Sequence, residues 1–163
     1  MRKIVAVLFT LFICLSLKGQ IWVDERCRLW AVDQLSKDDA WAVGLKGVIY
    51  HYDGKNWDRI VSIGATDLHS LCFSDAKNGF AGGTGGILMF KNNSWAPDST
   101  IKLKRFATVT GIYMLDSLNA WAVGDDFSEG FILKYSGRTW KKVEIPKCSA
   151  LNSVFFTSPN NGW

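Results

Sequence analysis

The chain has 163 residues, a formal net charge of +4 and eight Trp, and 13% of its residues are aromatic. Three of the 19 basic residues lie within the first twenty positions, so 16 basic residues face 15 acidic ones in the remainder. Because no long Lys/Arg run survives there, the sequence excludes an electrostatic nucleic-acid interface.

The first twenty residues have the layout of a secretory signal peptide. Arg2 and Lys3 precede an apolar run over 4–17, and Gly19 supplies a small residue after it. The run is shorter than the roughly 20 residues that a membrane-spanning helix needs. We therefore expect residues 1–20 to be a signal peptide and the protein to be exported without a membrane span. Its destination would be the periplasm, the cell surface or the medium.

The cysteines form none of the common metal or redox motifs. Cys27, Cys72 and Cys148 remain after cleavage, and no two cysteines have the C-x-x-C spacing. Their odd number leaves at least one thiol unpaired or paired outside this chain, and the sequence does not fix the pairing. A lipoprotein anchor would use Cys14, but the bulky residues before it disfavour that processing. We expect neither a structural zinc site nor a dithiol redox centre.

A repeat of about forty residues organises the rest of the chain. Segment 39–44 reads Asp-Ala-Trp-Ala-Val-Gly and returns at 119–124 with Asn in place of Asp, and 78–83 is a weaker copy. We call this segment of each repeat the first station. Its aromatic residues recur at intervals of 39, 41 and 42 residues, at Trp41, Phe80, Trp121 and Trp163. Its glycines are assigned as Gly44, Gly82 and Gly124. A second station recurs in step at Trp57, Trp95 and Trp140. Two stations in register indicate a true repeat.

Each repeat is predicted to form four short strands joined by polar or Gly-containing turns. A forty-residue period of this kind is typical of a propeller blade, because each sheet buries its faces only against neighbouring blades. We expect an all-β protein, a β-propeller of four-stranded antiparallel blades over residues 21–163. The repeats fall at about 29–67, 68–107 and 108–149, with an incomplete one at 150–163. An open sandwich or barrel would explain the short strands but not the fixed period.

Three and a fraction blades are too few to close a ring of typically four to eight. Trp163 falls inside the strand that continues as Ala-Val-Gly in earlier repeats. We therefore expect this chain to be the N-terminal part of a longer propeller whose remaining blades follow. The Trp residues are predicted to fill the wedge-shaped cores between blades rather than to stack on a ligand. Trp22, before the first repeat, is the least constrained.

The repeat motif resembles that of a known class of propellers. It consists of Ala-Trp-Ala-Val-Gly, a Gly turn, an Ile/Leu-rich strand ending in Tyr, and then Gly-x-Thr-Trp. This order resembles the BNR or Asp-box propellers and, among them, the photosystem II assembly and stability factor type. The resemblance covers residues 29–163 and implies the fold much more strongly than a function. Tyr52 and Tyr135 stand where a strict Asp-box has Asp, so the boxes are degenerate.

Catalytic constellations are not evident in the sequence. Sialidases share the Asp-box but also need an arginine triad, whereas Arg59, Arg105 and Arg138 lie at unrelated places in their repeats. His51 and His69 have no Cys, Asp or Glu at a chelating or orienting spacing, so no His-based site is predicted. We expect a protein that is not an enzyme over this span.

One loop is a candidate binding site. Asp125, Asp126, Phe127 and Glu129 lie in a hairpin that is longer and more acidic than the equivalent Leu-Lys-Gly turn of the first repeat. Longer loops on a rigid scaffold often carry binding, and Ca²⁺ is the one cofactor that such an oxygen-rich loop could hold. The alternative is a solvated hairpin tip.

Three readings of the function remain open. The first is an exported, non-catalytic scaffold for protein interaction or assembly. The second is a carbohydrate-binding or sialidase-type glycosidase propeller at the cell surface. A propeller that merely spaces other domains is a third reading. The identity of the protein or glycan partner does not follow from the residues.

Overall fold

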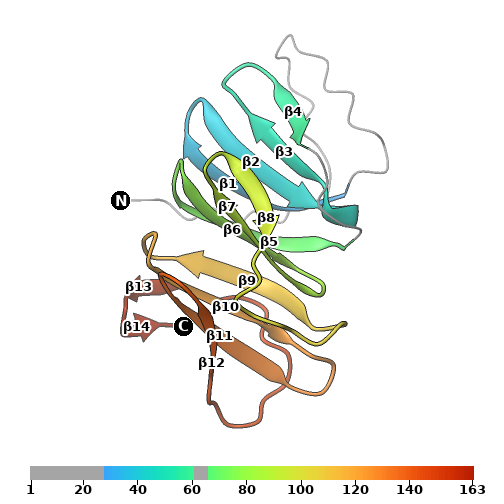
Figure 1. The fold of residues 1–163 in the computed structure, drawn as a ribbon, viewed down its shortest axis with the longest axis vertical. Helices are drawn as coiled ribbons and strands as arrows, with labels where there is room; N and C mark the ends of the chain where they lie inside the picture. Colours follow the sequence, from blue (N-terminus) through green and yellow to red (C-terminus); the bar gives the residue numbers. More distant parts are fainter. Residues whose placement is uncertain (1–27, 61–65) are drawn as a thin grey trace.

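The computed structural model describes residues 28–60 and 66–163, so the expected signal peptide, Trp22 and Cys27 lie outside the described residues. The chain forms three four-stranded sheets and a final two-stranded hairpin (Figure 1). The first sheet contains β1 (Leu29–Ser36), β2 (Asp39–Gly44), β3 (Ile49–Tyr52) and β4 (Trp57–Ile60). The second contains β5 (Leu68–Asp75), β6 (Asn78–Gly83), β7 (Gly86–Lys91) and β8 (Ser94–Pro97).

The third sheet contains β9 (Thr108–Met114), β10 (Asn119–Asp125), β11 (Gly130–Ser136) and β12 (Trp140–Val143). The hairpin of β13 (Phe156–Ser158) and β14 (Asn161–Gly162) opens a fourth repeat. Strand order in every sheet follows the chain, and all pairings are antiparallel. The predicted all-β architecture of four-stranded antiparallel blades is therefore confirmed.

The blades stack one on the next, in chain order from blue to red (Figure 1). The first strands are neighbours, since β1 contacts β5 and β5 contacts β9. Backbone amides of one blade donate to side chains of the blade before it. Phe73 N–H donates to Asp33 Oδ2 at 2.7 Å, and Met114 N–H donates to Cys72 Sγ at 3.3 Å. Cys72 is half-buried, and its sulfur accepts this hydrogen bond between the blades.

The core lies between the blades, as the station aromatics predicted. The aromatic side chains of both stations are buried, at Trp41, Phe80 and Trp121 in the first station and at Trp95 and Trp140 in the second. Trp57 is half-buried, and Trp163, the last residue, is 72% exposed. Trp30 on β1 is also exposed, so the expectation that Trp side chains fill the core does not hold for every one of them.

One glycine was assigned to the wrong position. A Cβ added at Gly44, Gly83 or Gly124 would lie 1.9 Å from a carbonyl oxygen at the start of the blade's first strand or just before it. Gly83 is therefore the equivalent of Gly44 and Gly124. Gly82 instead corresponds to Val43 and Val123, and a Cβ there would meet the Val109 side chain at 2.4 Å. The close approach of two backbones, not a positive φ, requires glycine at this place.

Candidate functional site

The loops of the blades lie on two faces, because strand ends alternate in an antiparallel sheet. The crossover face carries the second-to-third-strand turns and the connections between blades. Its turns are η1 (Leu45–Gly47), residues 84–85 and residues 126–129. Backbone bonds tie these turns to the connections, from Gly85 N–H to the Ala107 carbonyl and from Gly130 N–H to the Cys148 carbonyl. The hairpin face carries the other turns, at residues 37–38, 53–56, 76–77, 92–93, 115–118, 137–139 and 159–160.

The third turn of the crossover face is the candidate loop of the sequence. Val123 pairs with Ile132, whereas its equivalents pair as Val43 with Ile49 and Gly82 with Ile87. The third hairpin is therefore three residues longer than the first and four longer than the second, which confirms the predicted lengthening.

The acidic residues of this loop shape its turn. Asp125 Oδ1 accepts from Phe127 N–H at 3.1 Å, and Asp126 Oδ1 accepts from the Ser128 hydroxyl at 2.6 Å. Asp126 Oδ1 also accepts from the backbone N–H of Ser128 and of Glu129, both at 3.3 Å. Phe127 is held at a φ of 70°. The carboxylates thus satisfy the backbone of their own turn, as Asx turns do.

Lys104 reaches the same carboxylate from the connection between the second and third blades. Its Nζ lies 2.6 Å from Asp126 Oδ2. This contact is the main cause that lowers the pKa of Asp126 and raises the pKa of Lys104. A calcium ion at Asp126 would have to displace Lys104. Across residues 28–60 and 66–163, no cluster of three His, Cys, Asp or Glu side chains surrounds a metal-sized space.

Two exposed phenylalanines meet beside this loop. Phe106 and Phe127 are 59% and 80% exposed, and their ring centroids lie 6.0 Å apart in an edge-on arrangement. The guanidinium of Arg105 lies 5.4 Å from the centroid of Phe106. These three residues form what we call the aromatic patch. Large apolar side chains are seldom left exposed together without a partner surface to cover them.

Phe106 and Arg105 were not predicted as site residues. They lie in an irregular connection, so no periodic pattern singles them out, and only the fold brings them beside Phe127. A shallow hollow of about 390 Å³ includes part of the loop and is lined by Ser128, Glu129, Lys147, Cys148 and Ser149. Loop and patch therefore form one continuous, chemically mixed surface at the third blade.

A second exposed aromatic lies on the first strand. Trp30 is 51% exposed, and its ring centroid is 5.4 Å from that of His69. Both are the extra residues of β-bulges, Trp30 in β1 and His69 in β5. They are at the start of their strands, which is the end nearest the crossover face.

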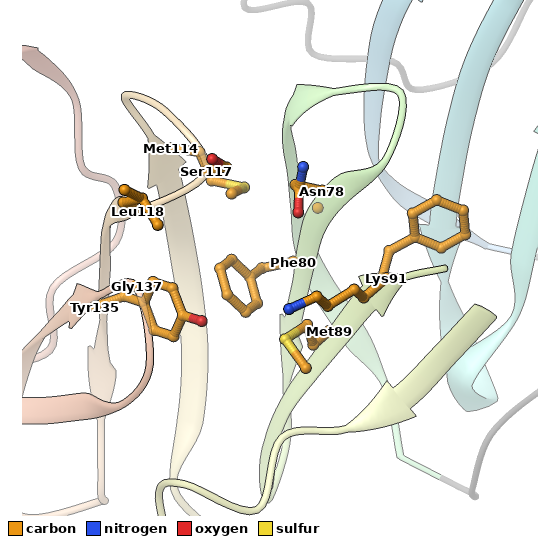
Figure 2. A pocket seen from close by; sticks show the side chains of 11 residues that line it. Asn78, Phe80, Met89, Lys91, Met114, Ser117, Leu118, Tyr135 and Gly137 are labelled. Carbon is orange, nitrogen blue, oxygen red and sulfur yellow. The ribbon is translucent and has the colours of Figure 1, made fainter. Parts of the chain in front are cut away.

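The hairpin face carries a separate pocket of about 250 Å³ between the second and third blades (Figure 2). Phe80 and Met89 come from the second blade, and Met114 and Tyr135 from the third. Burial, followed by the charge of Asp98, raises the pKa of Tyr135, which keeps its hydroxyl neutral. The sequence analysis did not single out this pocket.

The remaining sequence candidates do not converge on a catalytic centre. His51 Nε2 lies 3.0 Å from Asp39 Oδ1, so the expectation that no carboxylate orients a histidine is wrong. Its ring also stacks on Trp41, with centroids 4.1 Å apart, which makes it part of the packing between strands. Arg59 lies on β4, Arg105 on the crossover face and Arg138 in a turn of the hairpin face. They do not form an arginine triad.

Comparison with known proteins identifies the fold. No family model and no curated protein matches the chain. A solved structure of YCF48 bound to D1 peptide superposes with a TM-score of 0.58 at 17% identity, over 71% of this chain and 39% of that chain. YCF48 from Cyanidioschyzon merolae matches with a TM-score of 0.43 at 14% identity, over 88% and 65%.

The chain thus spans about two fifths of the first YCF48 chain and just under two thirds of the second. The first similarity shows the β-propeller fold. It agrees with the resemblance of the repeats to the photosystem II assembly factor type. In the part of the chain that the structure describes, no helix is long and apolar enough to span a membrane.

Proposed function

We propose that this protein is an exported, non-catalytic propeller scaffold that binds another protein through the crossover face of its third blade. The observation that carries the proposal is the aromatic patch, in which Phe106 and Phe127 are exposed side by side next to Arg105. Aromatic and arginine side chains are the groups that dominate the free energy of protein interfaces.

The surroundings of the patch suit a protein partner. Lys104 pairs with Asp126 and lies within the electrostatic influence of Glu129, and these charged residues are close in the chain to the patch residues. Charges of both signs beside an apolar centre resemble the polar rim of an interface. The turn that presents Phe127 is fixed by its own carboxylates, so little entropy is lost when a partner binds. The binding of D1 peptide by a YCF48 propeller of similar fold supports a protein or peptide ligand for this scaffold as well.

Photo-crosslinking tests the proposal in the full chain. A photoreactive phenylalanine analogue at position 127 should crosslink a partner in the native host, whereas the same group at Ser94 on β8 should not. With the purified partner, Phe127→Ala should weaken binding at least about tenfold, the loss expected of an interface anchor. Phe127→Trp should retain binding, and Lys55→Ala on the hairpin face should have no effect.

A loop exchange separates binding from folding. Replacement of residues 125–130 by the Leu-Lys-Gly turn of the first blade should keep the unfolding temperature, because that turn already closes an equivalent hairpin. Partner binding should be lost. If the exchanged protein binds with unchanged affinity, the loop is a solvated tip and the proposal is wrong. A calcium-dependent shift in the unfolding temperature, present in the parent and absent after the exchange, would support a calcium role for the acids.

Export is the second part of the proposal, and the N-terminal pattern alone supports it. N-terminal sequencing of the protein from the native host should find a chain that begins near Gly19 or Gln20. A chain that retains Met1 and stays in the cytoplasm would contradict export without affecting the proposed binding face.

A further inference from the structure

The three contacts between successive repeats differ in the side chains that meet at the first station. Trp41 faces Phe73 of the second blade, with ring centroids 5.4 Å apart. Trp121 stacks on Phe156 of the fourth repeat, with centroids 3.7 Å apart. Between the second and third blades the equivalent residues are Phe80 and Met114. The contact between the second and third blades thus has a Phe–Met pair where the other two contacts have a Trp–Phe pair. It lacks the indole ring that helps to fill the wedge-shaped core at the other two.

The missing volume coincides with the pocket on the hairpin face. Figure 2 shows Phe80 in the middle of the side chains that line this pocket, with Met89 on one side and Tyr135 on the other. Its volume of about 250 Å³ is below the roughly 300–1,000 Å³ of clefts that enclose drug-sized ligands. The pocket therefore has the size for one large side chain rather than for a complete small molecule.

The pocket lining is suited to an aromatic ring. Met89 and Met114 are flexible and polarisable, and thioether sulfur makes favourable contacts with ring edges. Phe80 is already in edge-on contact with Tyr135, at a centroid distance of 4.9 Å, so an added ring would extend an existing aromatic cluster.

Lys91 adds a charge at the rim. It follows Phe90 at the end of β7 and is exposed, and Figure 2 shows its nitrogen turned toward Phe80. Among residues 28–60 and 66–163, the lysine–carboxylate pairs formed are those of Lys37 and Lys104, so Lys91 pairs with no described carboxylate. A carboxylate on an incoming segment would complement it.

We propose that this pocket binds one aromatic side chain of an acidic segment of a partner protein, with the ring between Met89 and Met114 and a neighbouring carboxylate on Lys91. The ring takes the place that Trp–Phe pairing fills at the other two contacts. This site lies on the hairpin face and does not depend on the proposed function of the crossover face.

Methionine methyl resonances give a direct readout. The chain has three methionines, and two of them, Met89 and Met114, line the pocket. The full chain, labelled with ¹³C at the methionine methyl groups, is titrated with three blocked peptides: Gly-Asp-Phe-Glu-Gly, Gly-Asn-Phe-Gln-Gly and Gly-Asp-Ala-Glu-Gly. The first should shift both pocket methyls. The amide peptide should bind about two- to fivefold more weakly, the range of an exposed ion pair. The alanine peptide should cause no shift.

Variants of the pocket provide the decisive comparison. Phe80→Trp restores the missing indole and should abolish the shift of Met89 while the unfolding temperature stays equal or rises. Met114→Phe is the second filling variant, in case the first does not fold. Lys91→Gln should abolish the difference between the acidic and amide peptides, and Lys77→Gln on the same face should preserve it.

Several outcomes overturn the proposal. Equal binding of the phenylalanine and alanine peptides, or unchanged binding to a folded Phe80→Trp protein, would show that the pocket takes no ring. Shifts produced by benzoate but not by the phenylalanine peptides would mean that the pocket accepts small aromatic acids and no protein segment. Loss of the peptide shifts in Phe127→Ala as well would place the ligand on the crossover face instead.

Discussion

The contact between the first and second blades and the contact between the second and third use the same repeat with different side chains. In the first, Trp41 lies within 5.9 Å of three aromatic rings of the next blade, those of Phe73, Phe90 and Trp95. In the second, Phe80 reaches two rings, Tyr135 at 4.9 Å and Trp140 at 5.0 Å, and meets Met114 where the third ring would be. The backbone arrangement is the same at both contacts, but side chains fill the first contact and leave a pocket at the second.

This difference shows how a repeat protein can separate stability from binding. Because each blade packs mainly against its neighbours, the packing at one contact can be relaxed without a change at the next. The filled contact stabilises the propeller, and the contact with the smaller pair gains a pocket. The following experiments test that distinction.

The largest expected effect is that of removing the station aromatics. Trp41→Ala and Trp121→Ala should each lower the free energy of unfolding by about 3–5 kcal/mol, because the side chain leaves a large cavity. Phe80→Ala should fall at the low end of this range, since its site is already partly hollow. Urea unfolding of the full chain measures all three. Equal losses for Trp41→Ala and Phe80→Ala would show that the two contacts are packed alike.

Substitution at the close backbone approaches should have the next largest effect. Gly83→Ala places a Cβ 1.9 Å from the carbonyl oxygen of Asp67, which is backbone and cannot rotate away. The expected loss is about 2–3 kcal/mol, within the range of overpacked sites. Gly86→Ala is the matched control, because its Cβ would meet no atom within 4 Å. A Gly83→Ala protein that unfolds at the temperature of the control would refute the assignment of Gly83 to this position.

A buried hydrogen bond distinguishes the second contact from the first. Trp140 Nε1–H donates to Asp98 Oδ2 at 3.1 Å, whereas the equivalent Trp95 Nε1 is buried without a partner among the described residues. Asp98→Ala should cost about 1–2 kcal/mol, because it leaves the Trp140 N–H unsatisfied. Thermal unfolding monitored by Trp fluorescence measures the loss. No change in stability would mean that water replaces Asp98 at no cost.

The smallest effect concerns the loop of the crossover face. Lys104→Gln should raise the pKa of Asp126 toward the ordinary value, since Lys104 is the main cause of its depression. A depressed carboxylate pKa contributes stability that is fully present above the ordinary pKa and is lost as pH falls through the folded value. The difference in stability between the parent and the Lys104→Gln protein should therefore be constant between pH 5 and 8 and should shrink only at acidic pH. Carboxylate ¹³C titration measures the shift. The pKa of Asp116, lowered chiefly by Asn119 within its own turn, should stay constant as the control.

The repeat period was enough to predict the fold but not the contacts made between distant segments. Two stations in register gave the four strands and the buried positions of Trp41, Phe80, Trp121, Trp95 and Trp140. The assignment of Gly82 was wrong although the aligned copies 39–44 and 78–83 already place Gly83 opposite Gly44. The structure adds the reason that glycine is needed there, which is the carbonyl that Gly83 approaches.

The sites were less predictable than the fold. The length of the acidic hairpin is a local property and was predicted correctly, whereas Phe106, Arg105 and Lys104 lie in a connection without a period. The His51–Asp39 contact was missed because it joins two strands. The pocket itself had a signal that was not used, since the replacement of the Trp–Phe pair by Phe80 and Met114 is visible once the repeats are aligned.

The hydrogen bonds between blades also bear on synthesis of the chain. Asp33 joins Phe73, and Cys72 joins Met114, across sequence separations of 40 and 42 residues. At roughly 5–20 residues per second, a ribosome adds the next forty residues in about 2–8 s. Throughout that interval the Trp41 side of a newly made blade has no blade to cover it. Translation speed and the capture of this surface by chaperones therefore affect whether a new blade stays unaggregated until the next blade covers it.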